Sequence, residues 1–273
     1  MTIRALVLAA VQAIPALVLA QSPWLPGEKK AVVTTTFVWQ GFDKIWVGSE
    51  RVPLPSRVTQ RAFLGTVEYG VTSSIAVDAT SGFTGTDSTA FGGRNKDSGL
   101  IDTSAGIRWR FLDESRASSR FAPTITVRAA AIVKGTYRAN NPFSAGDGAP
   151  GGEVSLLWGK ALGETGAGVY GDAGFRKRSK GVPDDGFGSA GVYKRIKKVN
   201  LSAGYRHTNG LNGMNIGDPG FTFPKLKEVV RSTEFGAGLS KGKRYYQVFA
   251  AHAISGRNTV SKLVAGVSVS FHL

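Results

Sequence analysis

The chain ends in the sequence L-V-A-G-V-S-V-S-F-H-L, residues 263–273, and this stretch decides the fold. Two sets of side chains alternate along it, one apolar and one mostly small or polar. They are Leu263, Ala265, Val267, Val269, Phe271 and Leu273 on one face, and Val264, Gly266, Ser268, Ser270 and His272 on the other. Successive side chains of a β-strand point to opposite faces, so the alternation predicts a strand with one apolar face.

A terminal strand of this kind resembles the closing strand of bacterial outer-membrane β-barrels. Those strands typically end near an aromatic residue, and Phe271 occupies that place here. The resemblance implies that the barrel assembly machinery is a partner of the C-terminal strand. It also implies that the apolar face of the strand meets lipid.

The first twenty residues predict a cleaved secretory signal peptide. Arg4 precedes an apolar run at 5–19 that only Gln12 and Pro15 interrupt, and small residues follow at the expected cleavage site. The mature chain would begin at Gln21. No later stretch approaches the roughly 18 apolar residues of a membrane-spanning helix, so a membrane crossing would have to use strands.

Composition limits the classes of protein that fit. The 273 residues suit one all-β domain, and the absence of cysteine excludes disulfides and thiolate metal sites. The formal charge of +15 would suggest nucleic acid for a cytosolic chain, but an exported chain meets lipopolysaccharide phosphates instead. We therefore expect outer-membrane lipid and lipopolysaccharide as partners, with Arg176, Lys177, Arg178 and Lys180 facing the latter. The basic runs near 194–198 and 241–244 suit solvated turns.

The rest of the chain predicts about twelve strands, each close to the length of a tilted membrane strand. The predicted strands are 31–40, 60–70, 74–83, 100–111, 121–134, 153–162, 167–176, 187–194, 199–208, 229–240, 244–254 and 261–273. Long and short connections alternate between them, with long loops at 41–59, 135–152 and 209–228. We therefore predict an all-β transmembrane antiparallel up-and-down β-barrel over residues 30–273 in the outer membrane of a Gram-negative cell. The segment 21–29, with Pro23, Trp24 and Pro26, would lie in the periplasmic mouth as a partial plug.

Charged residues on the polar faces of these strands are the candidate pore lining. They are Glu68, Asp78, Asp102, Arg108, Arg110, Arg128, Asp172, Arg206 and Glu234. An arginine facing lipid at mid-bilayer would cost about 2–4 kcal/mol, so these side chains should face a lumen. Two interpretations stay open: a polar conduit in which the arginines favour anionic solutes, and a lumen closed by salt bridges.

An enzyme is the competing class. The segment 207–210 is faintly similar to the His-x-Ser-Asn pattern of outer-membrane lipid hydrolases, with His207 as the base. The nucleophile is missing, because position 209 is Asn and Thr208 should point to the opposite face from His207. The three histidines lack metal-ligand spacing, so we expect no catalysis, no metal and no cofactor.

Several segments together resemble the MetA-pathway-of-phenol-degradation family of outer-membrane barrels. They are 41–44, 67–72, 98–103, 106–114, 204–207 and 256–259, which read GFDK, VEYGVT, SGLIDT, GIRWRFLDE, GYRH and GRNT. The resemblance implies a porin-like transporter for small solutes, aromatic ones among them, while the preference for anionic solutes is expected from the arginines. The alternatives are a lipid-modifying hydrolase using His207 and a structural or adhesive barrel whose long loops bind a surface partner.

Overall fold

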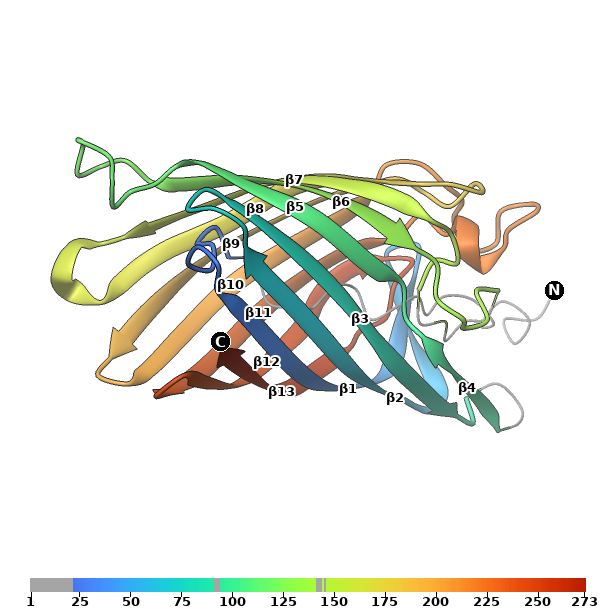
Figure 1. Cartoon of the computed structure of the whole chain (residues 1–273). Helices are drawn as coiled ribbons and strands as arrows, with labels where there is room; N and C mark the ends of the chain where they lie inside the picture. Colours follow the sequence, from blue (N-terminus) through green and yellow to red (C-terminus); the bar gives the residue numbers. More distant parts are fainter. Residues whose placement is uncertain (1–21, 91–93, 141–143, 145) are drawn as a thin grey trace.

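A computed structural model describes residues 22–90, 94–140, 144 and 146–273. The predicted signal peptide and its cleavage position at Gln21 lie outside the described residues. Thirteen strands form one sheet (Figure 1). They are β1 (Ala31–Val47), β2 (Glu50–Gly70), β3 (Ile75–Ser88), β4 (Asn95–Leu100), β5 (Thr103–Leu112), β6 (Thr124–Val133), β7 (Gly151–Ala161), β8 (Ala167–Arg178), β9 (Asp185–Ile196), β10 (Val199–Gly210), β11 (Val229–Lys241), β12 (Arg244–Arg257) and β13 (Leu263–His272).

The sheet closes into an antiparallel barrel of twelve strands. Strand β1 pairs with β2 on one side and with β13 on the other, and Val33 lies opposite Phe271 in the closing pair. Every other barrel strand pairs with the barrel strands that precede and follow it in the chain. The short β4 is not a barrel strand and pairs only with residues 83–88 of β3, whose other half pairs with β5. The prediction of a twelve-stranded antiparallel barrel is confirmed, and closure leaves the barrel no unpaired edge.

The predicted long loop at 41–59 is wrong. Strands β1 and β2 continue through this region and meet in a two-residue turn at Gly48 and Ser49. Gly48 has a positive φ of 58°, which a tight hairpin turn needs and glycine adopts without strain. Pro53 and Pro55 lie where the β1–β2 pairing is interrupted, a position that tolerates proline.

The two faces of the barrel wall differ as the alternation predicts. On β5, Ile107 is 59% exposed and Trp109 is 56% exposed, whereas Arg108 between them is 1% exposed. Because the barrel is closed, the exposed apolar face is the outside and the polar face surrounds the lumen. Among the described residues, no helix is long and apolar enough to cross a membrane.

The barrel has two distinct ends. We call the end where β1 begins and β13 finishes the terminal end; it carries the short turns at 71–74, 162–166, 197–198 and 242–243, and the longer connection at 113–123. The opposite end is the loop end. It carries the β1–β2 turn and the connections at 89–94, 134–150, 179–184, 211–228 and 258–262.

Candidate functional site

One side of the lumen carries a continuous chain of ion pairs, which we call the ladder. Its members alternate in charge across β2, β5, β3, β6, β7, β8 and β9, and are Glu68, Arg108, Asp78, Arg128, Glu153, Arg176 and Asp185. Each of these strands contributes a single charged residue to the ladder. The residues meet because the inward positions of neighbouring strands lie in register.

The first part of the ladder is the most deeply buried. Arg108 Nη2 lies 2.8 Å from Glu68 Oε1, and its Nε lies 3.4 Å from Asp78 Oδ1. Arg128 Nη2 lies 2.6 Å from the other oxygen of Asp78. The Arg108 and Arg128 side chains are 2% and 3% exposed, whereas Glu68 is 28% exposed. Glu68 is therefore the most exposed member of the ladder, although Arg176 and Asp185 at its other end are 21% and 18% exposed.

The second part extends the ladder to β9. Arg128 Nη1 lies 3.1 Å from Glu153 Oε1, and Arg176 Nη2 lies 2.8 Å from Glu153 Oε2. Arg176 Nη1 then lies 3.8 Å from Asp185 Oδ2. Four carboxylates face three guanidinium groups along the whole ladder, so its formal charge is negative.

A second group of charges lies farther round the lumen. Arg206 Nε on β10 lies 3.1 Å from Glu234 Oε1, and Arg206 Nη2 lies 3.5 Å from Asp172 Oδ1. The Ser189 hydroxyl donates a hydrogen bond to the same Asp172 oxygen. Here too carboxylates outnumber guanidinium groups.

The two remaining predicted pore residues lie near the ends of the barrel. Arg110 forms a 3.0 Å ion pair with Asp113 at the terminal end. Asp102 lies in the break between β4 and β5, where it accepts hydrogen bonds from Gly135 N and the Tyr137 hydroxyl, and pairs with Arg178. Its contacts hold the 134–150 connection against the barrel.

The sequence interpretation missed several lumen residues. Glu153 stands on the polar parity of its strand, and that parity could have identified it. Arg176 and Arg178 were assigned with Lys177 and Lys180 to an external basic cluster. Arg176 and Arg178 share the inward parity of β8, and Lys177 between them has the outward parity. Arg178 is accordingly 6% exposed, while Lys177 and Lys180 are exposed.

The opposite side of the lumen is apolar. A buried cluster from β1, β2, β12 and β13 lies there, made of Val38, Ala62, Leu64, Ala251 and Val264, with Ile101 and Phe249 packed against it. Gln40 and Gln60 lie beside this cluster and hydrogen-bond each other. The lumen therefore has one charged wall and one apolar wall.

The terminal end is crossed by the segment that precedes β1. Lys29 N donates a 2.7 Å hydrogen bond to Gly70 O on β2. The segment then reaches the far wall, where Thr126 Oγ1 donates a 2.7 Å bond to Pro23 O and Trp24 Nε1 donates a 3.0 Å bond to Glu114 Oε1. The Trp24 ring packs edge-on against Tyr193, with ring centroids 5.9 Å apart.

Gly159 on β7 makes room for this segment. A Cβ atom at Gly159 would lie 2.7 Å from the Trp24 ring and 2.8 Å from Pro23. Both distances are shorter than carbon atoms tolerate, so the glycine and the segment fit each other sterically.

The loop end is covered by the tip of the β1–β2 hairpin, residues 44–53, which we call the lid. Figure 1 shows this light-blue tip turned across the end of the barrel. Trp46 is buried against Val230 on β11 and Ala253 on β12, and Val47 packs against Ile216 of the 211–228 connection. The lid thus contacts strands that are not its neighbours in the sheet.

A break in the pairing separates the lid from the barrel wall. Phe42 pairs with Val58 and Lys44 pairs with Pro53, so Asp43 alone faces the residues 54–57. An interruption of this kind bends a hairpin and removes ladder hydrogen bonds. It gives the lid a defined hinge.

The connection at 258–262, which we call the strap, holds the lid down. Trp46 N donates a 2.7 Å bond to Thr259 O, and Ser261 N donates a 2.9 Å bond to Lys44 O. Asn258 accepts a 2.9 Å bond from Gly48 N and donates a 2.9 Å bond to Lys227 O. Asn258 therefore joins the lid, the strap and the 211–228 connection.

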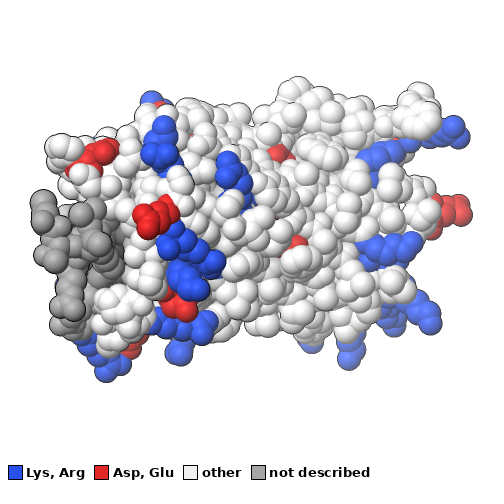
Figure 2. All heavy atoms as spheres, turned by 180° about the vertical axis from the view of Figure 1, so that it is seen from behind, with Lys and Arg blue, Asp and Glu red and all other residues white. Residues whose placement is uncertain are grey.

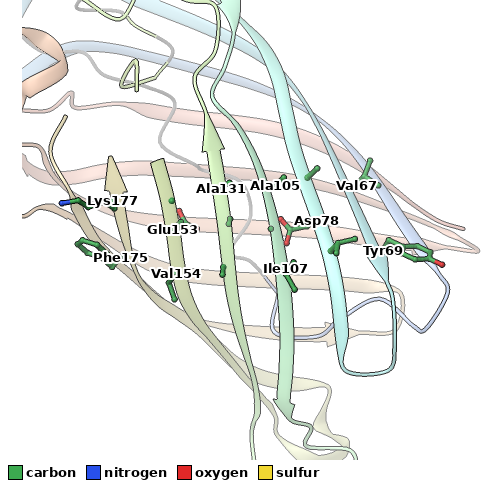
Figure 3. A pocket seen from close by; sticks show the side chains of 16 residues that line it. Val67, Tyr69, Asp78, Ala105, Ile107, Ala131, Glu153, Val154, Phe175 and Lys177 are labelled. Atoms are coloured by element: carbon green, nitrogen blue, oxygen red, sulfur yellow. The ribbon is translucent and has the colours of Figure 1, made fainter. Parts of the chain in front are cut away.

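One surface hollow lies outside the lumen. It is a groove of about 930 Å³ on the outer face of β2 to β8, whose lining includes Tyr69, Ile107, Val154 and Phe175 (Figure 3). These apolar side chains are exposed, whereas the Asp78 carboxylate belongs to the ladder on the inner side of the wall.

No catalytic arrangement forms around His207. Its neighbours across the sheet are Gly188 and Arg231, and the adjacent Thr208 lies on the opposite face. Among the described residues, no group of three or more His, Asp or Glu side chains could hold a metal ion.

Comparison with known proteins supports the barrel at the level of fold. No protein-family model matches the chain, and no curated protein matches it. The predicted MetA-pathway family is therefore not confirmed. The COG4313 outer membrane channel from Pseudomonas putida F1 is similar in structure, with a TM-score of 0.73 and 12% identity over 94% of this chain and 100% of that chain. The translocator domain of the autotransporter NalP from Neisseria meningitidis has a TM-score of 0.50 and 14% identity, over 90% of this chain and 88% of that domain.

Proposed function

We propose that this protein is an outer-membrane channel that passes small solutes through the barrel lumen. The observation that carries the proposal is the inverted wall, with exposed apolar side chains outside and ion-paired side chains inside. A soluble protein would bury the first set and expose the second, whereas a membrane barrel needs this arrangement. The likeness in fold to an outer membrane channel over nearly the whole chain supports it.

The lumen suggests which solutes pass. Its charged wall carries more carboxylates than guanidinium groups, and Glu68 and Glu234 are among the more exposed members, at 28% and 22%. This balance favours cations over anions, in contrast to the anion preference expected from the arginines alone. The residues of the apolar wall are at most 4% exposed in the closed form, because Ile101 and Phe249 pack against them. Uncovered in an open form, this wall would contact aromatic or aliphatic parts of neutral solutes. Such an amphipathic lumen is consistent with the MetA-pathway family, whose membership we propose on its sequence motifs.

Planar-bilayer recordings under a salt gradient test the proposal. We expect openings whose reversal potential indicates cation preference, and Glu68→Gln should reduce that preference because it removes an accessible negative charge from the lumen. Glu164→Gln changes the same residue type in an exposed turn at the terminal end and should leave the preference unchanged. Absence of conductance in every condition would contradict the channel.

In the described structure the path is covered at both ends, by the segment at 22–30 and by the lid. Passage therefore requires at least one cover to move. The hinge beside Asp43 makes the lid the element that can open without breaking the barrel, once its hydrogen bonds to the strap are released.

The closed lid should depend on pH through two titratable groups at the strap, the half-buried Glu228 and the buried Lys262. Burial raises the pKa of the Glu228 carboxyl to about 7, with a smaller rise from Asp147 and opposing effects from Lys262 and Thr259. Burial lowers the pKa of the Lys262 ammonium to about 8. Both groups would be hydrated, with ordinary pKa values, in an open mouth.

The direction in which pH changes the stability of the closed lid follows from the difference in proton affinity between the closed and the open form. The closed form binds a proton at Glu228 more tightly than the open form, so closure gains stability as pH falls from about 7 toward 4.5. The lowered pKa of Lys262 stabilises closure as pH rises from about 8 toward 10.5. We expect open probability to be highest near pH 7.5 and about tenfold lower at pH 5. Glu228→Gln should abolish the decrease on the acid side, while Glu164→Gln should retain it; an acid response that survives Glu228→Gln would assign it to another group.

A further inference from the structure

The terminal end carries a cluster of cations that the solute pathway does not use. They lie in the turns that join β9 to β10 and β11 to β12 or in the strand ends beside these turns, and are Lys194, Arg195, Lys197, Lys198, Lys241, Lys243 and Arg244. All seven are exposed. Figure 2 shows lysine and arginine side chains gathered at this end of the barrel, on the right of the view. We call this cluster the basic rim.

The fold brings the two halves of the basic rim together. Strands β10 and β11 are paired, and Ser240 N donates a 3.0 Å hydrogen bond to Lys198 O directly between the two turns. Positive φ angles at Lys197 and Gly242 make both turns tight, so the cations are held on short, ordered connections.

The basic rim has almost no opposing charge. The sequence has no Asp or Glu between Asp185 and Asp218, and none after Glu234. Within the described part of the chain, none of the seven cations forms an ion pair, although Lys194 donates a 2.7 Å hydrogen bond to Thr165 O. Glu164 lies in the neighbouring turn between β7 and β8. Concentrated like charge of this kind is unfavourable unless an anion neutralises it.

The depth of the basic rim in the wall indicates what that anion is. The last outward apolar row of these strands is Ile196, Val199, Leu239 and Tyr246, which lie opposite one another in register. Lys241 and Arg244 form the next outward pair along the strands, about 7 Å further toward the end. Lys194 lies one outward row deeper, opposite Leu201, and its ammonium group donates to Thr165 O at the end of the barrel. The other cations of the basic rim lie at or beyond the end of the apolar surface, which is the level of lipid headgroups.

We propose that the basic rim binds the phosphate groups of anionic phospholipids in the leaflet at the terminal end. Lys241 and Arg244 contact headgroups from the wall, and Lys197, Lys198 and Lys243 reach them from the turns. Arg244 also lies over the Phe271 ring, 5.7 Å from its centroid, which orients its guanidinium beside the closing strand. The bound lipid covers the part of the barrel that contains the closing β12–β13 pair.

Native mass spectrometry of the whole purified protein tests this proposal. The protein in neutral detergent is titrated with phosphatidylglycerol or phosphatidylethanolamine carrying identical acyl chains. We expect about tenfold tighter binding of phosphatidylglycerol. The variant K197Q/K198Q/K241Q/K243Q should lose this preference, because it removes four headgroup contacts from exposed turn positions.

The matched control removes four exposed lysines at or near the loop end, in the variant K96Q/K134Q/K180Q/K225Q. It has the same net charge as the first variant and should keep the preference. If both variants lost the preference for phosphatidylglycerol equally, the preference would depend on net charge alone and the proposal would be overturned. Equal affinity of the unaltered protein for the two lipids would overturn it as well. Conductance recorded in parallel reports on the channel separately, because the substituted lysines lie outside the lumen.

Discussion

Oxidation of an Ile45→Cys/Val260→Cys variant should close the barrel to solutes, and reduction should reopen it. Ile45 on the lid and Val260 on the strap form an antiparallel bridge. Hydrogen bonds from Trp46 N to Thr259 O and from Ser261 N to Lys44 O flank this pair, so the pair itself is not hydrogen-bonded. Cα atoms in such pairs lie about 4.5 Å apart, within the range that a disulfide spans.

The effect should be large in both directions. Ile45 and Val260 are 0% and 1% exposed and belong to the apolar cluster that seals the lid. Two smaller side chains weaken this seal, at about 1–3 kcal/mol for each site, so the reduced variant should open more often than the parent. The disulfide fixes the lid to the strap and should abolish those openings.

Conductance before and after a reducing agent measures the difference on one protein. The chain has no other cysteine, so no competing disulfide within the chain is possible. Each single-cysteine variant supplies the control and should not respond to the reducing agent. Equal conductance of the oxidised and reduced double variant would show that the lid is not the barrier.

Trp24→Ala should raise conductance by releasing the segment that crosses the terminal end. The indole loses its hydrogen bond to Glu114 and its ring contact with Tyr193. Removing a partly buried tryptophan costs about 2–3 kcal/mol, which shifts the balance between a bound and a released segment about 30-fold or more.

Trp158→Ala is the matched control, because Trp158 adjoins Gly159 on β7 but lies on the parity opposite to it. It should leave conductance unchanged. Gly159→Ala should also raise conductance, because its new methyl group would collide with the Trp24 ring and displace the segment. If neither Trp24→Ala nor Gly159→Ala alters conductance, the segment does not obstruct the path.

Strand alternation is the sequence property that assigns side chains to the two faces of the wall. Arg108 lies buried between the exposed Ile107 and Trp109, and Arg128 and Arg206 form ion pairs on the same face. That these arginines line a solute path stays a prediction. The prediction failed for the basic run at 176–178, because it was treated as one cluster although consecutive residues of a strand face opposite sides. It also failed at 41–59, which was predicted as a long loop although β1 and β2 continue through it.

The sequence by itself determined that this chain forms a barrel with an apolar outside and a charged inside, since alternation, strand length and turn residues are local properties. Only the tertiary structure decided which carboxylate meets which guanidinium, that Asn258 joins lid and strap, and that Trp24 lies against Glu114 across the terminal end. Those contacts join residues as many as 210 positions apart. They depend on the register in which twelve strands close, and register is a property of the whole sheet that no single segment encodes.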